Sequence, residues 1–391
     1  MMEIAEPEVR GILRHFETLP DPRCHVNRGH LLIDLIVISI CGVLAGADGP
    51  AAIVEWANSQ KSWLRKFLAL PSGIPSHDTV GRVLNALQPA AFQKCFGEWL
   101  KSLGEAADSK SETRDGDEPR DYLAIDGKTL RRSHDRKRGL GPLHLVSVFA
   151  TEHGLVLGQV ATAEKSNEIT AIPELLEQVD VKDAVVTIDA AGCQKKIAGT
   201  IIDRGGDFLL SLKGNQSKMH TAVRLKLLPI YESGESGPAI SRFVEEEKSH
   251  GRTERREYIL INAPSNLPNR AAWKGLRTIG LAVRSWNGAK GPKCELRFFL
   301  SSLPRNVRQF AKAARRHWKI ETTLHWCLDV TFREDESRLR GRRIAENLAW
   351  LRRLALTLIK QHPEKNSVAM KRRKAGWNTE YLLQVLTGTG N

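Results

Sequence analysis

The sequence has few cysteines and no CxxC motif: its six cysteines lie far apart in a chain of 391 residues. Neither a disulfide framework nor a zinc ribbon is therefore indicated, and reduced thiols favour a cytoplasmic setting. Cys24, His25 and His30 form a loose group, but they lack the spacing of metal ligands. The first residues, MMEIAEPEVRG, lack the basic, apolar and small-residue order of a secretion signal.

The sequence also lacks an uninterrupted apolar run of membrane-spanning length. The longest run, residues 31–47, contains Asp34 and is interrupted by glycines. A spanning helix needs about 20 predominantly apolar residues, so a buried helix is the better interpretation and no membrane partner is expected. We find no internal repeat.

Positive charge is abundant. Lys and Arg number 59 against 45 Asp and Glu, which gives a formal net charge of +14 and a pI of about 9.6. The excess is spread over many segments rather than confined to one tail. This balance indicates a polyanionic partner. The length allows a sizeable core and two or three domains.

Residues 1–105 are assigned to an N-terminal domain that is predicted to be all-helical, with short polar or Pro/Gly turns between apolar-periodic segments. Ser76 or Asp78 can cap a helix whose apolar positions share one face, while Arg82 and Asn85 point elsewhere. Two interpretations stay open, namely a helix-turn-helix that reads DNA and an ordinary helical bundle.

Strand patterns begin after the stretch 106–120, whose charge and lack of apolar residues are typical of a linker. Three β-rich segments predict an antiparallel meander, and helices then alternate with further strands. This order predicts a mixed α/β sheet covered by helices, and it is the order of a ribonuclease-H-like fold. The strands are expected at residues 122–126, 143–151, 154–164, 184–189 and 207–214, with helices at 168–179, 194–203 and 220–228.

Further strand patterns in residues 231–303 are predicted to form a β-rich insertion within an α/β domain that spans residues 121–360. Helical periodicity returns at Val307 and continues towards residue 360. The last part, residues 361–391, is predicted to be a basic tail with one short helix.

Two of the predicted strands end in the same way. Asp126 follows YLAI and Asp189 follows VVTI, and small residues come after each aspartate. A lone carboxylate beside Lys128, Arg131 and Arg132 would ordinarily be half of a salt bridge. Two buried strands of the same design instead indicate a shared site at one edge of a sheet.

A third acid is needed if the two aspartates hold divalent ions, because two monodentate ligands leave a second ion poorly coordinated. Glu321, in the helical segment RRHWKIETTLHW, is the candidate. The alternative for a helical glutamate is an exposed ion pair with a neighbour one turn away. Asp329 and Glu334 are the alternative third ligands.

Five segments of the chain, AIDGKTLRRS, VTIDAAGCQKKIA, LLSLKGNQ, SHGRTERRE and RHWKIETTLHWCLDVTFREDESRLRGRRIAENLAWLRRLALTLIK, span most of residues 122–360. Together they resemble bacterial insertion-sequence transposases of the DDE class, in the subgroup close to the H-repeat-associated proteins. The opening, ILRHFETLPDPR with HLLIDLIVISICGVLAGAD, resembles that subgroup's associated N-terminal domain. The resemblance implies a ribonuclease-H-like catalytic domain and assigns catalysis and metal binding to Asp126, Asp189 and Glu321.

One departure from the family pattern concerns the residues around the third acid. Related transposases carry a Tyr, Arg, Glu, Lys signature there, whereas this chain has Ala314, His317 and Leu328 at the positions of the Tyr, Arg and Lys. Only Glu321 matches, and Arg316 lies one residue from the arginine's position. The phosphate contact of that arginine is therefore left unassigned.

The resemblance implies two Mg²⁺ or Mn²⁺ ions per site, one to activate water or a 3′-hydroxyl and one to stabilise the leaving oxygen. Basic side chains near the acids would hold phosphates and make binding salt-dependent. Each of them has the alternative of a solvated surface charge. The predicted DNA contacts are Lys128, Arg131, Arg132, Lys213, Asn215, Arg315, Arg316 and Lys319.

Three side chains allow two interpretations each. Asn215 can contact a base or sugar, or it can simply belong to a Gly-Asn turn. Trp318 and Trp326 can stack on a flipped base, but their helical spacing favours burial in the core.

The resemblance thus implies a DNA transposase that binds the terminal inverted repeats of an insertion sequence and catalyses metal-dependent strand cleavage and strand transfer. Its partners would be double-stranded DNA at element ends and target, and a second copy of the chain, because two ends must be joined. A bacterial cytoplasmic, nucleoid-associated location follows. Two rivals are a domesticated, catalytically inactive DNA-binding protein and a structure-specific nuclease that cuts but never joins.

Overall fold

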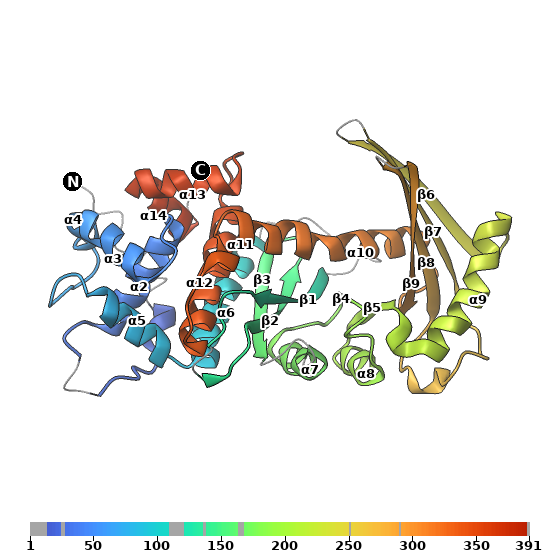
Figure 1. Ribbon diagram of the computed structural model, residues 1–391, viewed down its shortest axis with the longest axis horizontal. Helices are drawn as coiled ribbons and strands as arrows, with labels where there is room; N and C mark the ends of the chain where they lie inside the picture. Colours follow the sequence, from blue (N-terminus) through green and yellow to red (C-terminus); the bar gives the residue numbers. More distant parts are fainter. Residues whose placement is uncertain are drawn as a thin grey trace.

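The computed structural model describes residues 14–24, 28–108, 121–135, 138–162, 168–249, 252–288 and 291–388. Figure 1 shows an elongated molecule, with helices from both ends of the chain gathered at one end. A sheet occupies the middle, and long strands flanked by one helix form the other end.

One mixed sheet runs through the described residues in the strand order β3-β2-β1-β4-β5-β9-β8-β7-β6. Its first half contains the antiparallel meander β1, β2 and β3, followed by β4 and β5, which run parallel to β1. The predicted meander and the predicted alternation of helix and strand are confirmed. The bounds are β1 Tyr122–Leu130, β2 Leu143–Ala150, β3 Leu155–Thr162, β4 Val185–Ile188 and β5 Asp207–Leu212.

β1 is longer than the sequence predicts. The predicted strand ends at Asp126, whereas the observed strand continues to Leu130. The parallel partner β4 stops at Ile188, opposite Ile125, but the antiparallel partner β2 keeps pairing along the rest of β1. Hydrogen bonds to β2 therefore hold the backbone extended through the predicted turn.

Helices cover both faces of this sheet. α7 (Glu168–Gln178) and α8 (Lys195–Asp203) pack on the face that includes Leu123 and Ile125, and α9 (Ser217–Ser233) extends this layer over β8 and β9. α10 (Val307–Lys319) covers the other face. The three helices predicted between residues 168 and 228 are thus confirmed.

The predicted β-rich insertion is an extension of the same sheet. β9 pairs antiparallel with β5 along Leu209–Leu212, and β8, β7 and β6 follow as long antiparallel neighbours. β6 lies at the edge, and its polar sequence FVEEEKS gave no clear strand signal. The bounds are β6 Ile240–Ser249, β7 Arg252–Asn262, β8 Thr278–Gly288 and β9 Gly291–Ser301.

The described residues before 109 form helices. Ser76 caps α5 by accepting a hydrogen bond from the Thr79 amide, and Arg82 and Asn85 are exposed, as predicted. The last helix runs to Asp108, so the predicted linker begins within it, and residues 109–120 lie outside the described residues. The helices are α2 Leu32–Leu44, α3 Pro50–Ser59, α4 Lys61–Leu64, α5 His77–Ala86 and α6 Pro89–Asp108.

The predicted buried helix is α2, which is almost wholly enclosed. Its Asp34 carboxylate accepts a hydrogen bond of 2.9 Å from the Leu70 amide, so the buried charge has a partner. No helix among the described residues combines the length and apolar character needed to span a membrane.

The N-terminal helices share one hydrophobic core with the C-terminal helices α12 (Arg342–Gln361), α13 (Val368–Trp377) and α14 (Thr379–Thr387). α12 packs against α2, α5 and α6. Near its middle, the buried Asn347 amide donates hydrogen bonds of 2.7 and 3.1 Å to the carbonyls of Leu84 and Leu87. The two ends of the chain are therefore packed as one helical body.

The long helix predicted to begin at Val307 changes its winding after α10. A π-helical turn, η6 (Ile320–His325), separates α10 from α11 (Trp326–Val330), and a 3₁₀ turn, η7 (Glu334–Glu336), follows. Single π turns inside helices occur frequently at functional sites. Glu321 lies in this turn.

The basic cluster of the C-terminal segment lies within α13 rather than in a solvated tail. The Arg372 side chain is buried, and it donates to the carbonyls of Val43 at 3.1 Å, Thr331 at 2.6 Å and Ala47 at 3.3 Å. It thereby ties α13 to the end of α2 and to the segment after α11.

We expect Arg372→Ala to destabilise the protein by ~2–4 kcal/mol, because the variant removes a buried side chain and three hydrogen bonds to carbonyls. The matched control is Arg373→Ala, which removes an exposed arginine from the same helix and should change stability by less than about 0.5 kcal/mol. Urea denaturation of both variants measures the difference, and equal stabilities would contradict the assigned role of Arg372.

Candidate active site

Asp126 and Asp189 lie at neighbouring positions on two parallel strands. The pairing of β1 with β4 ends where Ile125 stands opposite Ile188, so each aspartate is the next residue after the paired segment, Asp126 within β1 and Asp189 just beyond the end of β4. The negative charge of Asp189 is one of the causes that raise the pKa of Asp126. The structure thus brings together the two strand ends that the sequence predicts as a shared site.

Glu321 lies in the π-helical turn η6 and its side chain is exposed. Burial, together with the charges of Asp189, Glu321 and Glu168, raises the pKa of Asp126 to about 7. Carboxylates outside β1 therefore disfavour the ionised form of Asp126.

The turn after Asp189 is braced by hydrogen bonds. The Asp189 carboxylate accepts from the amides of Ala191 at 2.9 Å and Gly192 at 3.4 Å. Asn215, predicted as a DNA contact, donates its side-chain amide to the Ala190 carbonyl at 2.5 Å. In this structure Asn215 therefore supports the turn that carries Asp189.

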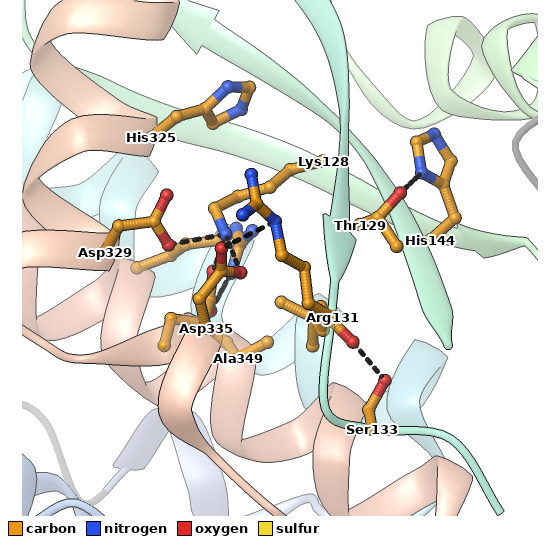
Figure 2. Close-up of polar contacts among 12 residues, drawn as sticks. Lys128, Thr129, Arg131, Ser133, His144, His325, Asp329, Asp335 and Ala349 are labelled. Atoms are coloured by element: carbon orange, nitrogen blue, oxygen red, sulfur yellow. Dashed lines mark hydrogen bonds and ion pairs between the residues drawn. The ribbon is translucent and has the colours of Figure 1, made fainter. Parts of the chain in front are cut away.

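Lys128 occupies a buried ion-pair cluster instead of a surface facing DNA. Its ammonium lies 2.7 Å from Asp329, 3.0 Å from Asp335 and 3.6 Å from Glu334, and only 7% of its side chain is exposed. Figure 2 shows Asp329 and Asp335 converging on Lys128. The predicted phosphate contact is corrected accordingly, because three carboxylates already surround the charge.

The same cluster accounts for both alternatives to Glu321. Glu334 is fully buried and pairs with Arg353 at 2.8 Å. Burial opposes its ionisation, but the charges of Arg353 and Lys128 hold the pKa of Glu334 below its ordinary value. Asp329 pairs with Lys128 at 2.7 Å. Of the three candidate acids, Glu321 is the one whose charge is among the causes that raise the pKa of Asp126.

Two histidines beside the acids are neutral at physiological pH. His325 Nδ1 lies 3.6 Å from the Asp126 carboxylate, and burial, with the charges of Arg353 and Lys128, lowers the pKa of His325 to about 3. Burial lowers the pKa of His317 to about 4, and its ring contacts the Thr187 hydroxyl at 3.1 Å. Sequence reasoning missed His325, whose only signal is its position four residues after Glu321.

Three of the predicted DNA contacts are exposed. Arg131 and Arg132 lie at the end of β1 and are both exposed, although Arg131 also pairs with Asp335 at 3.2 Å. Lys213 follows β5 and is exposed, and its charge is among the causes that lower the pKa of Asp189 against the larger effect of burial. These positions suit contact with phosphates.

The remaining predicted contacts, on α10, are engaged with other parts of the protein. Arg315 pairs with Glu245 at 3.0 Å and Glu247 at 3.1 Å on β6. Arg316 pairs with Glu152, and Lys319 donates to the Thr151 carbonyl at 3.5 Å.

A groove of about 820 Å³ lies between α10 and the strands β6–β9. Its lining includes eight Lys or Arg side chains and two Glu side chains, so cations outnumber carboxylates in it. Five of the arginines, however, pair with carboxylates: Arg256, Arg284, Arg297, Arg315 and Arg316. The Arg297 guanidinium lies 3.9 Å from the centre of the Trp318 ring in this groove.

Trp326 is 57% exposed, so its predicted burial is wrong.

The carboxylates suit a hard divalent cation. In the described ranges, no group of three or more His, Cys, Asp or Glu side chains is placed so that it could hold a metal ion. Mg²⁺ does not require such a group, because it usually binds one or two carboxylates and completes its octahedron with water and substrate phosphates. The raised pKa of Asp126, caused by burial and by neighbouring carboxylates, would be relieved by a bound cation.

Comparisons with known proteins agree over nearly the whole chain. A family model described as "DDE_Tnp_1-associated" matches residues 13–100, and one described as "Transposase DDE domain" matches residues 117–358. The chain is 37% identical over 389 residues to the H repeat-associated putative transposase YhhI of Escherichia coli K12, covering 98% of this chain and 99% of that protein. It is 38% identical over 383 residues to the putative transposase YncI of Escherichia coli O157:H7, covering 97% and 95%. The chain therefore belongs to the DDE transposase family.

Proposed function

We propose that this chain is an active DNA transposase, which binds the terminal inverted repeats of an insertion sequence, cleaves the DNA there and transfers the freed strand to a target. The observation that carries the proposal concerns three acids from separate elements: the charges of Asp189 and Glu321 both act on Asp126. Lys128, two residues after Asp126, is paired with other carboxylates. Membership of the transposase family supports it.

We assign two Mg²⁺ or Mn²⁺ ions to Asp126, Asp189 and Glu321, since hard oxygen donors match these cations. Bound there, the ions would activate water or a 3′-hydroxyl and stabilise the leaving oxygen. The amides of Ala191 and Gly192 orient the Asp189 carboxylate, and the neutral ring of His325 adds no positive charge beside Asp126.

The DNA would cross the edge of the sheet where the acids lie. Its path would include the exposed side chains of Arg131, Arg132 and Lys213, and the groove beside α10, where cations outnumber carboxylates, would extend it. Neutralising phosphates in this way releases counterions and makes affinity fall with salt.

The proposal extends to the wider organisation of the protein. We assign residues 121–360 to a ribonuclease-H-like catalytic domain and residues 1–105 to binding of the DNA ends. Two ends must be joined, so the working form would be a homodimer on DNA, in the bacterial cytoplasm with the nucleoid.

The alternative is a catalytically inactive DNA-binding protein of transposase origin. This alternative is favoured by the residues that this chain has at the positions where related transposases carry Tyr, Arg and Lys. Here Ala314 and Leu328 are buried apolar residues, and His317 is neutral and contacts Thr187. None of the three offers a cation to a phosphate.

Cleavage of a labelled duplex that carries the element's end separates the two functions. With Mg²⁺, the wild type should nick at the end, while Asp126→Ala, Asp189→Ala and Glu321→Gln should reduce the rate by ~10³-fold or more and still bind DNA. Losing charge stabilisation at the reacting phosphate removes several kcal/mol of barrier lowering.

EDTA with wild type is the control for metal dependence. Binding without cleavage under Mg²⁺ and Mn²⁺ would establish the inactive DNA-binding protein instead. Cutting that survives in Glu321→Gln alone would exclude Glu321 as the third ligand.

Asp126→Asn should stabilise the metal-free protein. The pKa of Asp126 is raised from 3.8 to about 7, chiefly by burial. Between those pH values the unfolded carboxylate ionises first, so wild-type stability falls as the pH rises from about 4 to about 7. In EDTA at pH 8 we expect the variant to gain ~2 kcal/mol, and at pH 4 almost nothing.

Urea denaturation at the two pH values measures this difference. The control is Glu177→Gln, an exposed acid on α7, which should leave stability unchanged at both. Millimolar Mg²⁺ should raise the stability of wild type but not of Asp126→Asn. A variant less stable than wild type at pH 8 would contradict the raised pKa of Asp126.

Arg132→Ala should lower the slope of log affinity against log salt by about one, since one phosphate contact is lost. Lys182→Ala is the matched control, because Lys182 is exposed and precedes β4 at the end opposite Asp189. DNA binding measured over a range of salt should show no change of slope for Lys182→Ala. An unchanged slope for Arg132→Ala would remove Arg132 from the DNA path.

A further inference from the structure

A second pocket, of about 470 Å³, lies where β5 ends, between α9 and β9. Its lining comes from residues 211–213 of β5 and the turn after it, from α9, and from residues 296–298 of β9. The pocket lies on the face of the sheet that α9 covers, as Figure 1 shows for α9 and its neighbouring strands. The groove beside α10 lies on the opposite face, so the two cavities are separate, although Arg297 lines both.

The wall that α9 contributes is a stripe of side chains along one side of the helix. His220, Arg224, Leu228 and Glu232 line the pocket at intervals of four residues. Residues four apart lie one above the other on a helix. The carboxylate of Glu232 comes eight residues after Arg224, roughly 12 Å further along the helix axis. The two nitrogen-bearing side chains are therefore gathered at the start of α9, and the carboxylate lies at its far end.

The cations of this pocket are available to a ligand. In the described part of the chain, Lys213 and Arg224 are exposed and have no ion-pair partner. The His220 ring packs edge-on against Phe298, with ring centres 5.3 Å apart, which holds it at the pocket wall. Five arginines of the groove beside α10 pair instead with carboxylates. An anion entering the α9 pocket therefore displaces no carboxylate from Lys213 or Arg224.

Hydrogen bonds tie the pocket to the turn that carries Asp189. β4 and β5 are parallel neighbours, so their carboxyl ends lie at the same edge of the sheet. After β5, the Asn215 side chain donates to the Ala190 carbonyl at 2.5 Å, and the Gln216 side chain donates to the Cys193 carbonyl at 3.0 Å. The loop at the mouth of the pocket is thereby fixed relative to the acid on β4.

Strand spacing sets the distance between the pocket and the predicted catalytic acids. Neighbouring strands lie about 4.8 Å apart, so the end of β5 is roughly 5 Å from the end of β4 and roughly 10 Å from Asp126 on β1. Phosphates of one DNA strand follow each other about every 3.4 Å along the helix axis. A strand whose reacting phosphate lies at the acids would therefore bring a nearby phosphate level with the pocket.

We propose that Lys213, His220 and Arg224 form a phosphodiester-binding site, which holds the DNA backbone about one to three nucleotides from the phosphate that is cleaved. This inference rests on the proposed function, because it takes DNA as the ligand, and it adds His220 and Arg224 to the predicted contacts. The guanidinium and ammonium groups donate charge-assisted hydrogen bonds to phosphate oxygens, and the imidazole offers a further N–H.

DNA binding over a range of salt, with a duplex that carries the element's end, measures this contact. Arg224→Ala should weaken binding by ~5-fold to 10-fold at moderate salt and lower the slope of log affinity against log salt by about one. Lys226→Ala is the matched control, because Lys226 is an exposed cation of the same helix that does not line the pocket. It should leave the slope unchanged, and equal effects of the two variants would overturn the inference.

Methylphosphonate substitution, which removes the charge of one phosphate at a time, locates the contact. At one or two positions within about three nucleotides of the cleaved phosphate, the substitution should weaken binding by wild type but not by Arg224→Ala. The two changes remove the same contact, so their effects should not add. Effects that add at every such position would show that no phosphate of this strand lies in the pocket. Lys213→Ala, on the opposite wall, replaces Arg224→Ala if that variant does not fold.

Two further measurements separate this inference from the proposed function and from another source of phosphate. Wild type that makes the contact but does not cleave with Mg²⁺ would overturn the proposed function and support the phosphate site. Arg224→Ala that binds and cleaves as wild type does would overturn the inference alone. Calorimetric titration with inorganic phosphate, without DNA, should detect only weak binding. Binding as tight as that of the duplex would identify a site for free phosphate instead.

Discussion

The ion pairs of Lys128 are the interactions on which the geometry of the site depends. Lys128 stands two residues after Asp126 on β1, and it binds Asp329 and Asp335, which follow Glu321 along the chain. Glu334 extends the cluster to Arg353 on α12. A strand and a helical segment that are distant in sequence are thereby held in contact. Removing one member would leave buried charges without partners, which is strongly destabilising.

Charge is divided unequally between the site and the rest of the molecule. The chain carries a net charge of +14, yet the corner around Asp126 is acidic: burial, and then the charges of Asp189, Glu321 and Glu168, raise the pKa of Asp126 to about 7. Basic side chains are instead gathered in the groove beside α10. A surface with an excess of positive charge attracts a polyanion such as DNA. At the acidic corner itself, bound cations would be needed where the reacting phosphate of the DNA would lie.

The sequence predicts the parts of this arrangement that follow from local patterns. Strand periodicity and the Ile-Asp endings locate Asp126 and Asp189, and cap chemistry locates Ser76. It does not predict the burial of Lys128 or Arg372, because a side chain's partners depend on tertiary contacts between distant segments. Glu168 looks like an ordinary first-turn acid of a helix, and only packing of α7 on β2 places it beside Gly127. The π turn at Glu321 has no sequence signal of its own.

That π turn is supported from α12. Widening a helix by one residue disturbs the regular backbone hydrogen bonds, so a freed carbonyl needs another donor. The Lys360 ammonium donates to the Thr323 carbonyl at 3.0 Å, and burial lowers the pKa of Lys360 to about 8, which still leaves it mainly protonated at neutral pH.

α12 also packs on the N-terminal helices, so the position of Glu321 and the helical N-terminal part depend on the same element. Deleting residues 1–105 would expose the apolar face of α12 and disturb the third acid. Effects on DNA binding at the N-terminal part are therefore better tested with exposed positions of α5, such as Arg82, than by truncation.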